Sequence, residues 1–135
     1  MIHYQTNTVP KQDALVELYT SVGWLRYTQN PASLLTAVEN SFIVATAWQE
    51  TELVGLIRGI SDGESILYIQ DLLVKPAYQG QGIGSHLIQG VLSRYPAIRQ
   101  IMLLTDEKEK NRHFYEKQGF SSCDQGELVA FYRAN

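Results

Sequence analysis

The pattern of hydrophobic and polar residues over the first 40 positions predicts a short strand followed by two helices. Apolar residues recur at helical spacing up to Val22, and Gly23 has the residue type that ends a helix. Asn30 followed by Pro31 is typical of an N-cap and a first helical residue. The predicted elements are a strand over residues 2–6, a helix over 11–21, a loop over 23–28 and a helix that ends near Asn40.

Residues 42–74 show the pattern of three β-strands. Their apolar runs are separated by two short polar segments, Gln49-Glu50-Thr51 and Ser61-Asp62-Gly63-Glu64. Connections this short join antiparallel neighbours. The predicted strands cover residues 42–48, 53–60 and 65–74.

The helical period returns at Ile83 and must end at Pro96, because proline cannot continue a helix. Asp106 and Glu109 have the spacing of a capping box, and Gly119 is placed to end the helix that they begin. The predicted elements are a helix from Ile83, a strand over 100–104, a helix from Asp106, and closing strands over 120–123 and 128–132.

This order of elements predicts a single α/β (α+β) domain over residues 1–135. Its sheet is expected to be mixed but mostly antiparallel, with about six or seven strands flanked by about four helices. Hydrophobic residues make up 44% of the chain, which supplies enough apolar surface for one core.

Charge and residue types exclude several classes of function. The formal charge of −3, from 11 basic and 14 acidic residues, argues against binding to nucleic acid. Cys123 is the only cysteine, and His3, His86 and His113 lack metal-ligand spacing, so neither a disulfide nor a metal site is predicted. Residues 1–10 do not resemble a signal peptide, and no stretch approaches the roughly 20 apolar residues of a membrane span. We expect a cytoplasmic protein that does not engage a membrane.

Gly80, Gly82 and Gly84 lie between a predicted strand and a predicted helix. Without side chains, their backbone N–H groups can approach a ligand closely, and a helix N-terminus favours an anion such as a phosphate. A glycine-rich turn that only joins the two elements is the alternative. A P-loop would need a lysine before Ser85, and a dinucleotide fingerprint starting at Gly80 would need glycine at Ser85, so both fit poorly.

Two ordered motifs resemble those of the GNAT acetyltransferase superfamily. The run from Val74 through Pro76 to Gln79-Gly80-Gln81-Gly82-Ile83-Gly84 is similar to the acetyl-CoA motif of that family. Phe114-Tyr115-Glu116-Lys117-Gln118-Gly119-Phe120 resembles a second family segment at the expected distance downstream. The predicted element order is also that of the family.

The resemblance implies transfer of an acetyl group from acetyl-CoA to a primary amine by direct attack, without a metal. It implies that Leu73 and Val74 serve the pantetheine arm through their backbone, and that Tyr115 is the general acid for the CoA thiolate. The pyrophosphate would be held by Gln79, Gly80, Gln81, Gly82, Ile83, Gly84 and Ser85. The acceptor would be a small-molecule, peptide or protein amine.

The general base is where this sequence departs from the family pattern. Many relatives carry a glutamate at the positions of Tyr68 or Gln70, and neither residue is acidic here. Asp71 is the nearby carboxylate on the strand, and by strict alternation it faces away from both unless the strand bulges. Asp71 is expected either to act through water or to anchor the strand by a hydrogen bond. A water chain without a dedicated base is a third alternative.

Lys108 stands where relatives often have an asparagine, and Asn111 lies one helical turn before Tyr115, so either is a candidate contact to the cofactor. Relatives place acceptor contacts between their first two helices. The matching candidates here are Trp24, Arg26 and Tyr27, although Trp24 equally fits a cap on the core.

Two alternative functions remain open at this stage. One is a non-catalytic acyl-CoA sensor or partner-binding module of the same fold, suggested by the absent strand carboxylate. The other is a different nucleotide-binding enzyme that uses the same loop. The sequence also leaves open a homodimer.

Overall fold

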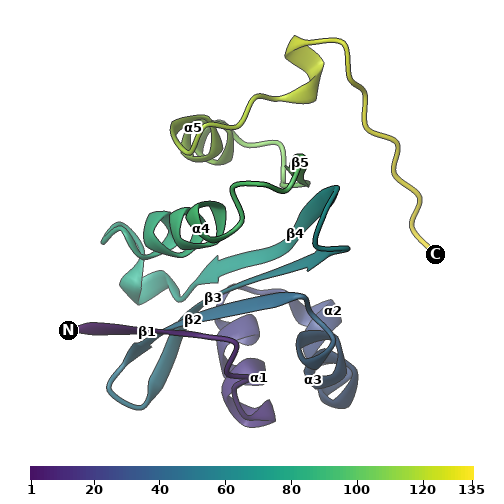
Figure 1. The fold of residues 1–135 in the computed structure, drawn as a ribbon. Helices are drawn as coiled ribbons and strands as arrows, with labels where there is room; N and C mark the ends of the chain where they lie inside the picture. The colour runs from purple at the N-terminus through teal and green to yellow at the C-terminus, as the bar shows by residue number, and fades with distance from the viewer. The chain divides into compact units, whose positions relative to one another are not determined.

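The computed structural model describes all residues from Met1 to Asn135. The chain forms two compact units, residues 1–104 and residues 105–135, and each is described by itself. Figure 1 shows the elements of both units. A single domain over the whole chain stays a prediction.

The first unit is built on a five-stranded sheet with the order β1-β2-β3-β4-β5. Consecutive strands from β1 to β4 pair antiparallel, whereas β4 and β5 pair parallel. A mixed, mostly antiparallel sheet is therefore confirmed, with five strands instead of about six or seven. The strands are β1 (Ile2–Thr6), β2 (Ile43–Gln49), β3 (Glu52–Ser61), β4 (Ile66–Val74) and β5 (Gln100–Leu103).

One face of the sheet carries three helices, α1 (Gln12–Ser21), α2 (Leu25–Thr28) and α3 (Pro31–Glu39), as Figure 1 shows. The N-cap prediction for α3 is confirmed, because Asn30 Oδ1 accepts a hydrogen bond from the Ser33 N–H at 3.2 Å. The loop predicted over residues 23–28 holds for Gly23 and Trp24 but is wrong for residues 25–28, which form the single helical turn of α2. The buried core on this face comprises Leu15, Leu18, Tyr19, Leu34, Val38, Val44, Leu53, Leu56 and Leu73.

The opposite face carries α4 (Ile83–Arg94), which follows the short 3-10 helix η1 (Pro76–Tyr78). Gly55 on β3 allows this helix to approach closely, because a Cβ there would lie 3.1 Å from Ile83 Cγ2. Ile83 is only 2% exposed. The first residue of α4 is therefore packed directly against the sheet.

The second unit contains α5 (Glu109–Lys117) and the 3-10 helix η2 (Cys123–Gln125). Gly119 follows α5 with a φ of +95°, as its predicted place at the helix end requires. The capping-box prediction is wrong, because Lys108 is the N-cap and no side chain caps the helix.

The closing strands predicted over 120–123 and 128–132 are not formed. Asp124 instead accepts hydrogen bonds from Ser122 and Arg112, which favours the turn of η2. Leu128, Val129, Phe131 and Tyr132 are 64–93% exposed, so the apolar pattern there has no ladder partner to stabilise a strand.

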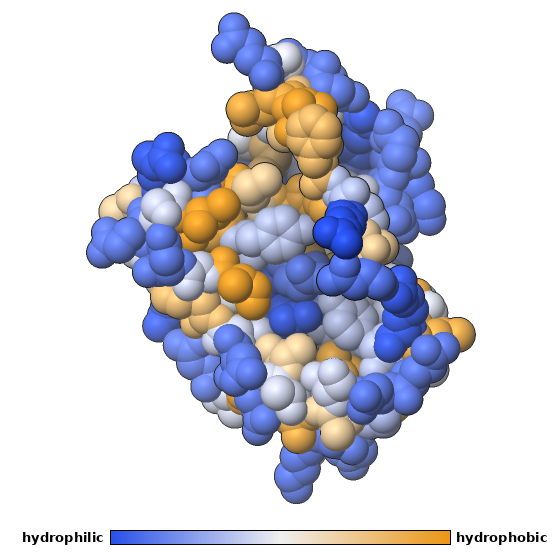
Figure 2. All heavy atoms as spheres, turned by 90° about the vertical axis from the view of Figure 1, so that its right-hand side faces the viewer, coloured by the Kyte–Doolittle hydropathy of each residue, from blue (hydrophilic) through white to orange (hydrophobic).

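None of the helices combines the length and apolar character needed to cross a membrane. No group of three or more His, Cys, Asp and Glu side chains is arranged as metal ligands. On the face shown in Figure 2, hydrophilic side chains alternate with separate hydrophobic clusters.

The tight packing at Gly59 on β3 gives a stability prediction. A Cβ there would lie 2.8 Å from Leu67 Cδ1 and 3.2 Å from Ile43 Cγ2, and Leu67 is fully buried. Gly59→Val is expected to lower the free energy of unfolding by about 1–3 kcal/mol in urea titrations. Gly90→Ala, at an exposed helical glycine with open space, should raise it by roughly 0.5–1 kcal/mol. Equal stability of the two variants would contradict the packing described.

Candidate active site

The glycine loop adopts a conformation that exposes backbone N–H groups at the start of α4. Gly80 and Gly82 have φ values of +78° and +84°, in the left-handed region that favours glycine, and a Cβ at either would meet nothing within 4 Å. Gly82 is the N-cap of α4, and no side chain caps the helix. Because the first N–H groups of a helix have no intrahelical acceptor, this end can bind an anion.

Strand β4 leaves part of its backbone unpaired beside this loop. The parallel ladder with β5 ends at the pair Ile69 and Leu103, whereas β4 continues to Val74. Gln79 Nε2 donates to the Val74 carbonyl at 2.9 Å. The start of the glycine loop is thereby tied to the end of the strand. Leu73 and Val74 pair with β3 on one side but have no strand partner on the β5 side.

Lys75 fixes the connection between β4 and the loop. Its ammonium lies 2.7 Å from Glu17 Oε1 and 2.9 Å from Glu52 Oε2, although Lys75 itself is only 8% exposed. Burial alone would lower the Lys75 pKa, but hydrogen bonds to the two carboxylates raise it. Tyr78 also donates to Glu52 at 3.1 Å. The segment before the loop is therefore held to α1 and to the start of β3.

Strand β4 bulges at Gln70, which decides the direction of Asp71. Asp71 pairs with Arg58 and Ile69 pairs with Gly59, so Gln70 has no cross-strand partner. Gln70 Nε2 and Asp71 Oδ1 both lie within hydrogen-bond distance of the Tyr27 hydroxyl, at 3.2 Å and 2.8 Å. The bulge therefore brings two consecutive side chains to the same face of the sheet, which strict alternation forbids.

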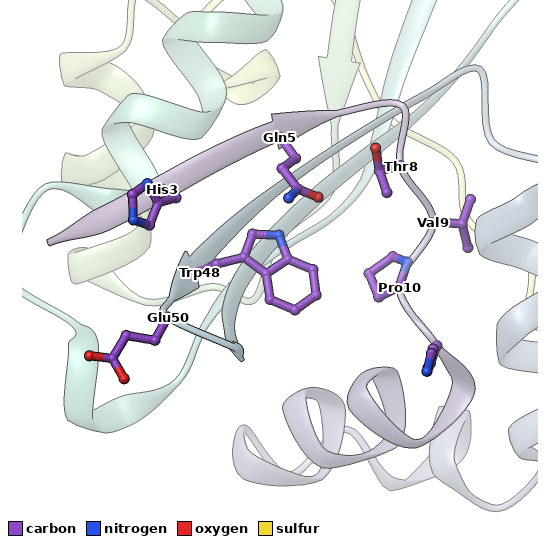
Figure 3. Close-up of a pocket in the computed structure, with 8 residues that line it drawn as sticks. His3, Gln5, Thr8, Val9, Pro10, Trp48 and Glu50 are labelled. Carbon is purple, nitrogen blue, oxygen red and sulfur yellow. The ribbon is translucent and has the colours of Figure 1, made fainter.

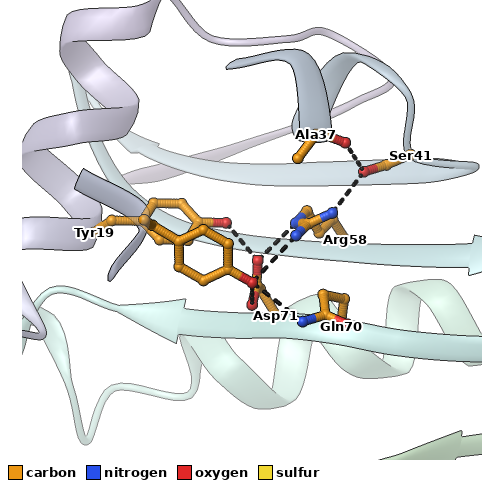
Figure 4. A network of polar contacts seen from close by, with 7 residues as sticks. Tyr19, Ala37, Ser41, Arg58, Gln70 and Asp71 are labelled. Carbon is orange, nitrogen blue, oxygen red and sulfur yellow. Dashed lines mark hydrogen bonds and ion pairs between the residues drawn. The ribbon is translucent and has the colours of Figure 1, made fainter. Parts of the chain in front are cut away.

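Asp71 is the centre of a buried polar network (Figure 4). Its Oδ2 accepts from Arg58 Nε at 2.6 Å and from the Tyr19 hydroxyl at 2.9 Å, and Asp71 is 3% exposed. Arg58 also donates to Tyr27 at 3.2 Å and to Ser41 at 3.3 Å. These contacts favour the anchoring alternative for Asp71 over access to a water molecule.

The network changes the proton affinities of its members. Burial and then the Asp71 charge raise the pKa values of Tyr19 and Tyr27. Burial alone would lower the Arg58 pKa, but Asp71 outweighs burial and raises it. Both phenols and the guanidinium therefore keep their protons at neutral pH.

The segment between α1 and α3 lies beside this network. Tyr27 packs edge to face on Tyr19, with ring centroids 4.9 Å apart, and Trp24 contacts the same Tyr19 ring at 5.9 Å. Trp24 is 36% exposed, so one part of its indole faces solvent and another contacts the core. Arg26 is exposed on α2.

The predicted residues of the second unit lie on or next to α5. Tyr115 is half-buried, with its ring 5.0 Å from Phe114 and 5.9 Å from Phe120, and burial raises its pKa. Asn111 Nδ2 donates to the Asp106 carbonyl at 3.2 Å, which occupies one of its donors within the unit. Lys108 is exposed at the N-cap.

A separate open pocket lies beside β1 (Figure 3). It is lined by His3, Gln5, Thr8, Val9, Pro10, Lys11, Trp48 and Glu50. None of these residues was predicted to belong to the functional site. Trp48 Nε1 donates a hydrogen bond to Thr46 Oγ1 at 2.8 Å, so this indole is fixed by a contact within β2.

A helix start open to an anion, next to a strand with unpaired backbone, is the arrangement that the sequence resemblance implies. The model of the Acetyltransferase (GNAT) family matches residues 8–120. This chain belongs to the GNAT acetyltransferase family. Its family membership and its relatives support an acyltransferase.

The relatives and solved structures agree with this assignment. An uncharacterized N-acetyltransferase, ycf52, from Gracilaria tenuistipitata var. liui is 30% identical over 97% of this chain and 73% of its own length. Histone acetyltransferase TAP1 from Glycine max is 33% identical over 90% of this chain and 56% of its own length. A GNAT family acetyltransferase from Streptococcus pneumoniae TIGR4 superposes with a TM-score of 0.89 and 34% identity, covering 100% of this chain and 98% of the other.

For this GNAT protein, sequence reasoning missed three members of the network, Arg58, Tyr19 and Ser41. Asp71 and Tyr27 were named separately, and the structure brings them together through a direct hydrogen bond. The sequence did offer one signal for Arg58. It is a charged residue within the apolar strand run from Leu53 to Ile60, and a buried charge there needs a partner of opposite charge.

The buried ion pair gives a prediction for Arg58. Arg58→Met leaves the Asp71 charge buried without its cation, so the free energy of unfolding should fall by about 3–5 kcal/mol in urea titrations. The double variant Arg58→Met/Asp71→Asn should recover part of that loss, because the charge is removed with its partner. Arg112→Met removes the more exposed ion pairs with Glu107 and Asp124 and should lower the free energy of unfolding far less than Arg58→Met. Equal losses at Arg58 and Arg112 would contradict the account.

Proposed function

We propose that this protein transfers an acetyl group from acetyl-CoA to a primary amine by direct attack of the amine on the thioester. The observation that carries the proposal is the uncapped start of α4, where Gly80 and Gly82 leave the backbone N–H groups open. The pyrophosphate of the cofactor would accept hydrogen bonds from Gln79 to Ser85. An anion there is also favoured by the dipole of α4.

The unpaired end of β4 suits the remainder of the cofactor. Backbone groups of Leu73 and Val74 would pair with the pantetheine arm, as a further strand would pair with the sheet. This places the thioester near the bulge of β4, where a backbone N–H can stabilise the oxyanion that forms during attack. Trp24 and Arg26 are proposed to contact the acceptor directly, and Tyr27 is proposed to act on it through its hydrogen bond with Gln70.

Of the two roles predicted for Asp71, we propose the anchoring one. Its carboxylate accepts hydrogen bonds from Arg58, Tyr19 and Tyr27, which hold it to β3, α1 and α2. A lysine-like amine with a pKa of about 10.4 requires roughly 4–5 kcal/mol to lose its proton at pH 7. Deprotonation would then proceed through water, or through desolvation of the amine.

Because the Asp71 carboxylate is engaged by Arg58, Tyr19 and Tyr27, no carboxylate of β4 is assigned as the base. This also supports a second candidate, a non-catalytic acyl-CoA-binding module of the same fold. A panel of amines assayed by release of the free CoA thiol separates the two candidates. Amine-dependent release supports the enzyme. Tight acetyl-CoA binding without release for any amine supports the binding module.

The cofactor site is tested by Gly82→Trp. The new side chain would fill the open space above the loop, so affinity for acetyl-CoA should fall at least roughly tenfold, as expected for lost charge-assisted hydrogen bonds. Isothermal titration measures the affinity, and circular dichroism checks the fold. Gly23→Trp is the matched control, because Gly23 also has a positive φ and open space but lies outside the loop. Equal affinity of both variants would refute this pyrophosphate site.

The proposed acid is tested by Tyr115→Phe. Loss of a hydrogen bond to the departing thiolate should lower kcat by roughly tenfold to a hundredfold and leave the KM for acetyl-CoA within about twofold. Because burial raises the Tyr115 pKa, the phenol stays protonated and no loss of rate through Tyr115 is expected below about pH 10. Tyr132→Phe, at an exposed tyrosine, is the control. An unchanged kcat in Tyr115→Phe would remove this residue from the mechanism.

A further inference from the structure

Asp71 and Gln70 are linked through the Tyr27 hydroxyl, and these hydrogen bonds allow only one assignment of donors and acceptors. Asp71 is an ionised carboxylate in a salt bridge with Arg58, so it accepts hydrogen bonds and donates none. The single hydroxyl proton of Tyr27 must therefore point to Asp71 Oδ1, 2.8 Å away. The Tyr27 oxygen is left with two lone pairs.

Two donors occupy these lone pairs. Arg58 Nη2 lies 3.2 Å from the Tyr27 oxygen, and Gln70 Nε2 lies at the same distance. Only the NH2 group of Gln70 can face this oxygen, because its carbonyl would place two acceptors together. The Gln70 carbonyl, Oε1, is consequently the other end of the amide and is turned away from Tyr27.

The position of Gln70 makes this orientation relevant to the acceptor amine. Gln70 is the unpaired residue of the β4 bulge, and it is exposed while its neighbour Asp71 is buried. The proposed function also puts the thioester near this bulge. An oriented amide oxygen at that place can accept a hydrogen bond from an N–H donor.

We infer that Gln70 Oε1 accepts a hydrogen bond from the acceptor amine, and that Tyr27, Asp71 and Arg58 are positioning residues that fix the amide in this orientation. The inference rests on the proposed function. Gln70 takes no proton in this arrangement. A primary amine keeps an N–H for Gln70 while its lone pair is directed at the thioester carbonyl.

Steady-state kinetics with an amine that the wild type acetylates tests the inference. Gln70→Leu should raise the KM for the amine about tenfold and leave the KM for acetyl-CoA within about twofold. Tyr27→Phe should raise the amine KM by roughly threefold to fivefold, because the amide loses its fixed orientation. The double variant should be no worse than Gln70→Leu, since Tyr27 acts through Gln70. The inference would be overturned if the two substitutions raised the amine KM by the product of their single effects. It would also be overturned if Gln70→Leu raised the KM for the amine and the KM for acetyl-CoA equally.

Gln100→Leu and Tyr95→Phe are the matched controls, since both residues lie outside the network, and they should leave both KM values unchanged. A second readout does not depend on turnover. In 15N-labelled protein, the Nε2 proton resonances of Gln70 should move in Tyr27→Phe, and the proton donated to the Tyr27 hydroxyl should move most. Resonances that do not move would overturn the inference even if the enzyme is active. A wild type that acetylates no amine would refute the proposed function, and the NMR comparison would then decide the amide orientation by itself.

Discussion

Arg58 and Asp71 form a salt bridge of 2.6 Å on the face of the sheet that packs against α1, and both side chains are nearly excluded from water. Two charges there are tolerated only when they are paired and their remaining donors and acceptors are satisfied. Tyr19, Tyr27 and Ser41 supply those partners, and no buried side-chain polar atom of the chain lacks one. The ion pair therefore ties α1, α2 and the end of α3 to two adjacent strands.

The consequence for function lies in the geometry of β4. The bulge at Gln70 turns Asp71 to the face of α1, and beyond it β4 runs free of β5 toward Lys75 and the glycine loop. Lys75 is held by two carboxylates, and Ile83 packs on Gly55. The strand that would receive the thioester is thus fixed at both ends, once by the network around Asp71 and once by the contacts before α4.

Local signals in the sequence predicted much of this structure. The glycine loop, the N-cap at Asn30 and the helix end at Gly119 depend on neighbouring residues, so composition and spacing were sufficient. The Asp71 network was not predictable in the same way, since Tyr19 is 52 positions from Asp71 and Arg58 is 13. The strand predicted over 128–132 failed because β propensity needs a paired neighbour, and its side chains are exposed. The role of Tyr115 depends on contacts with substrate and stays a prediction.

The central claim is that acetyl-CoA binds with its pyrophosphate on the glycine loop and its arm along β4. Backbone amide chemical shifts, followed by NMR while CoA is titrated into the 15N-labelled protein, test this most directly. The account predicts that the largest changes fall at Gly80, Gly82 and Gly84, with further changes at Leu73 and Val74. Changes confined to the pocket beside β1, at His3 and Trp48, would contradict it.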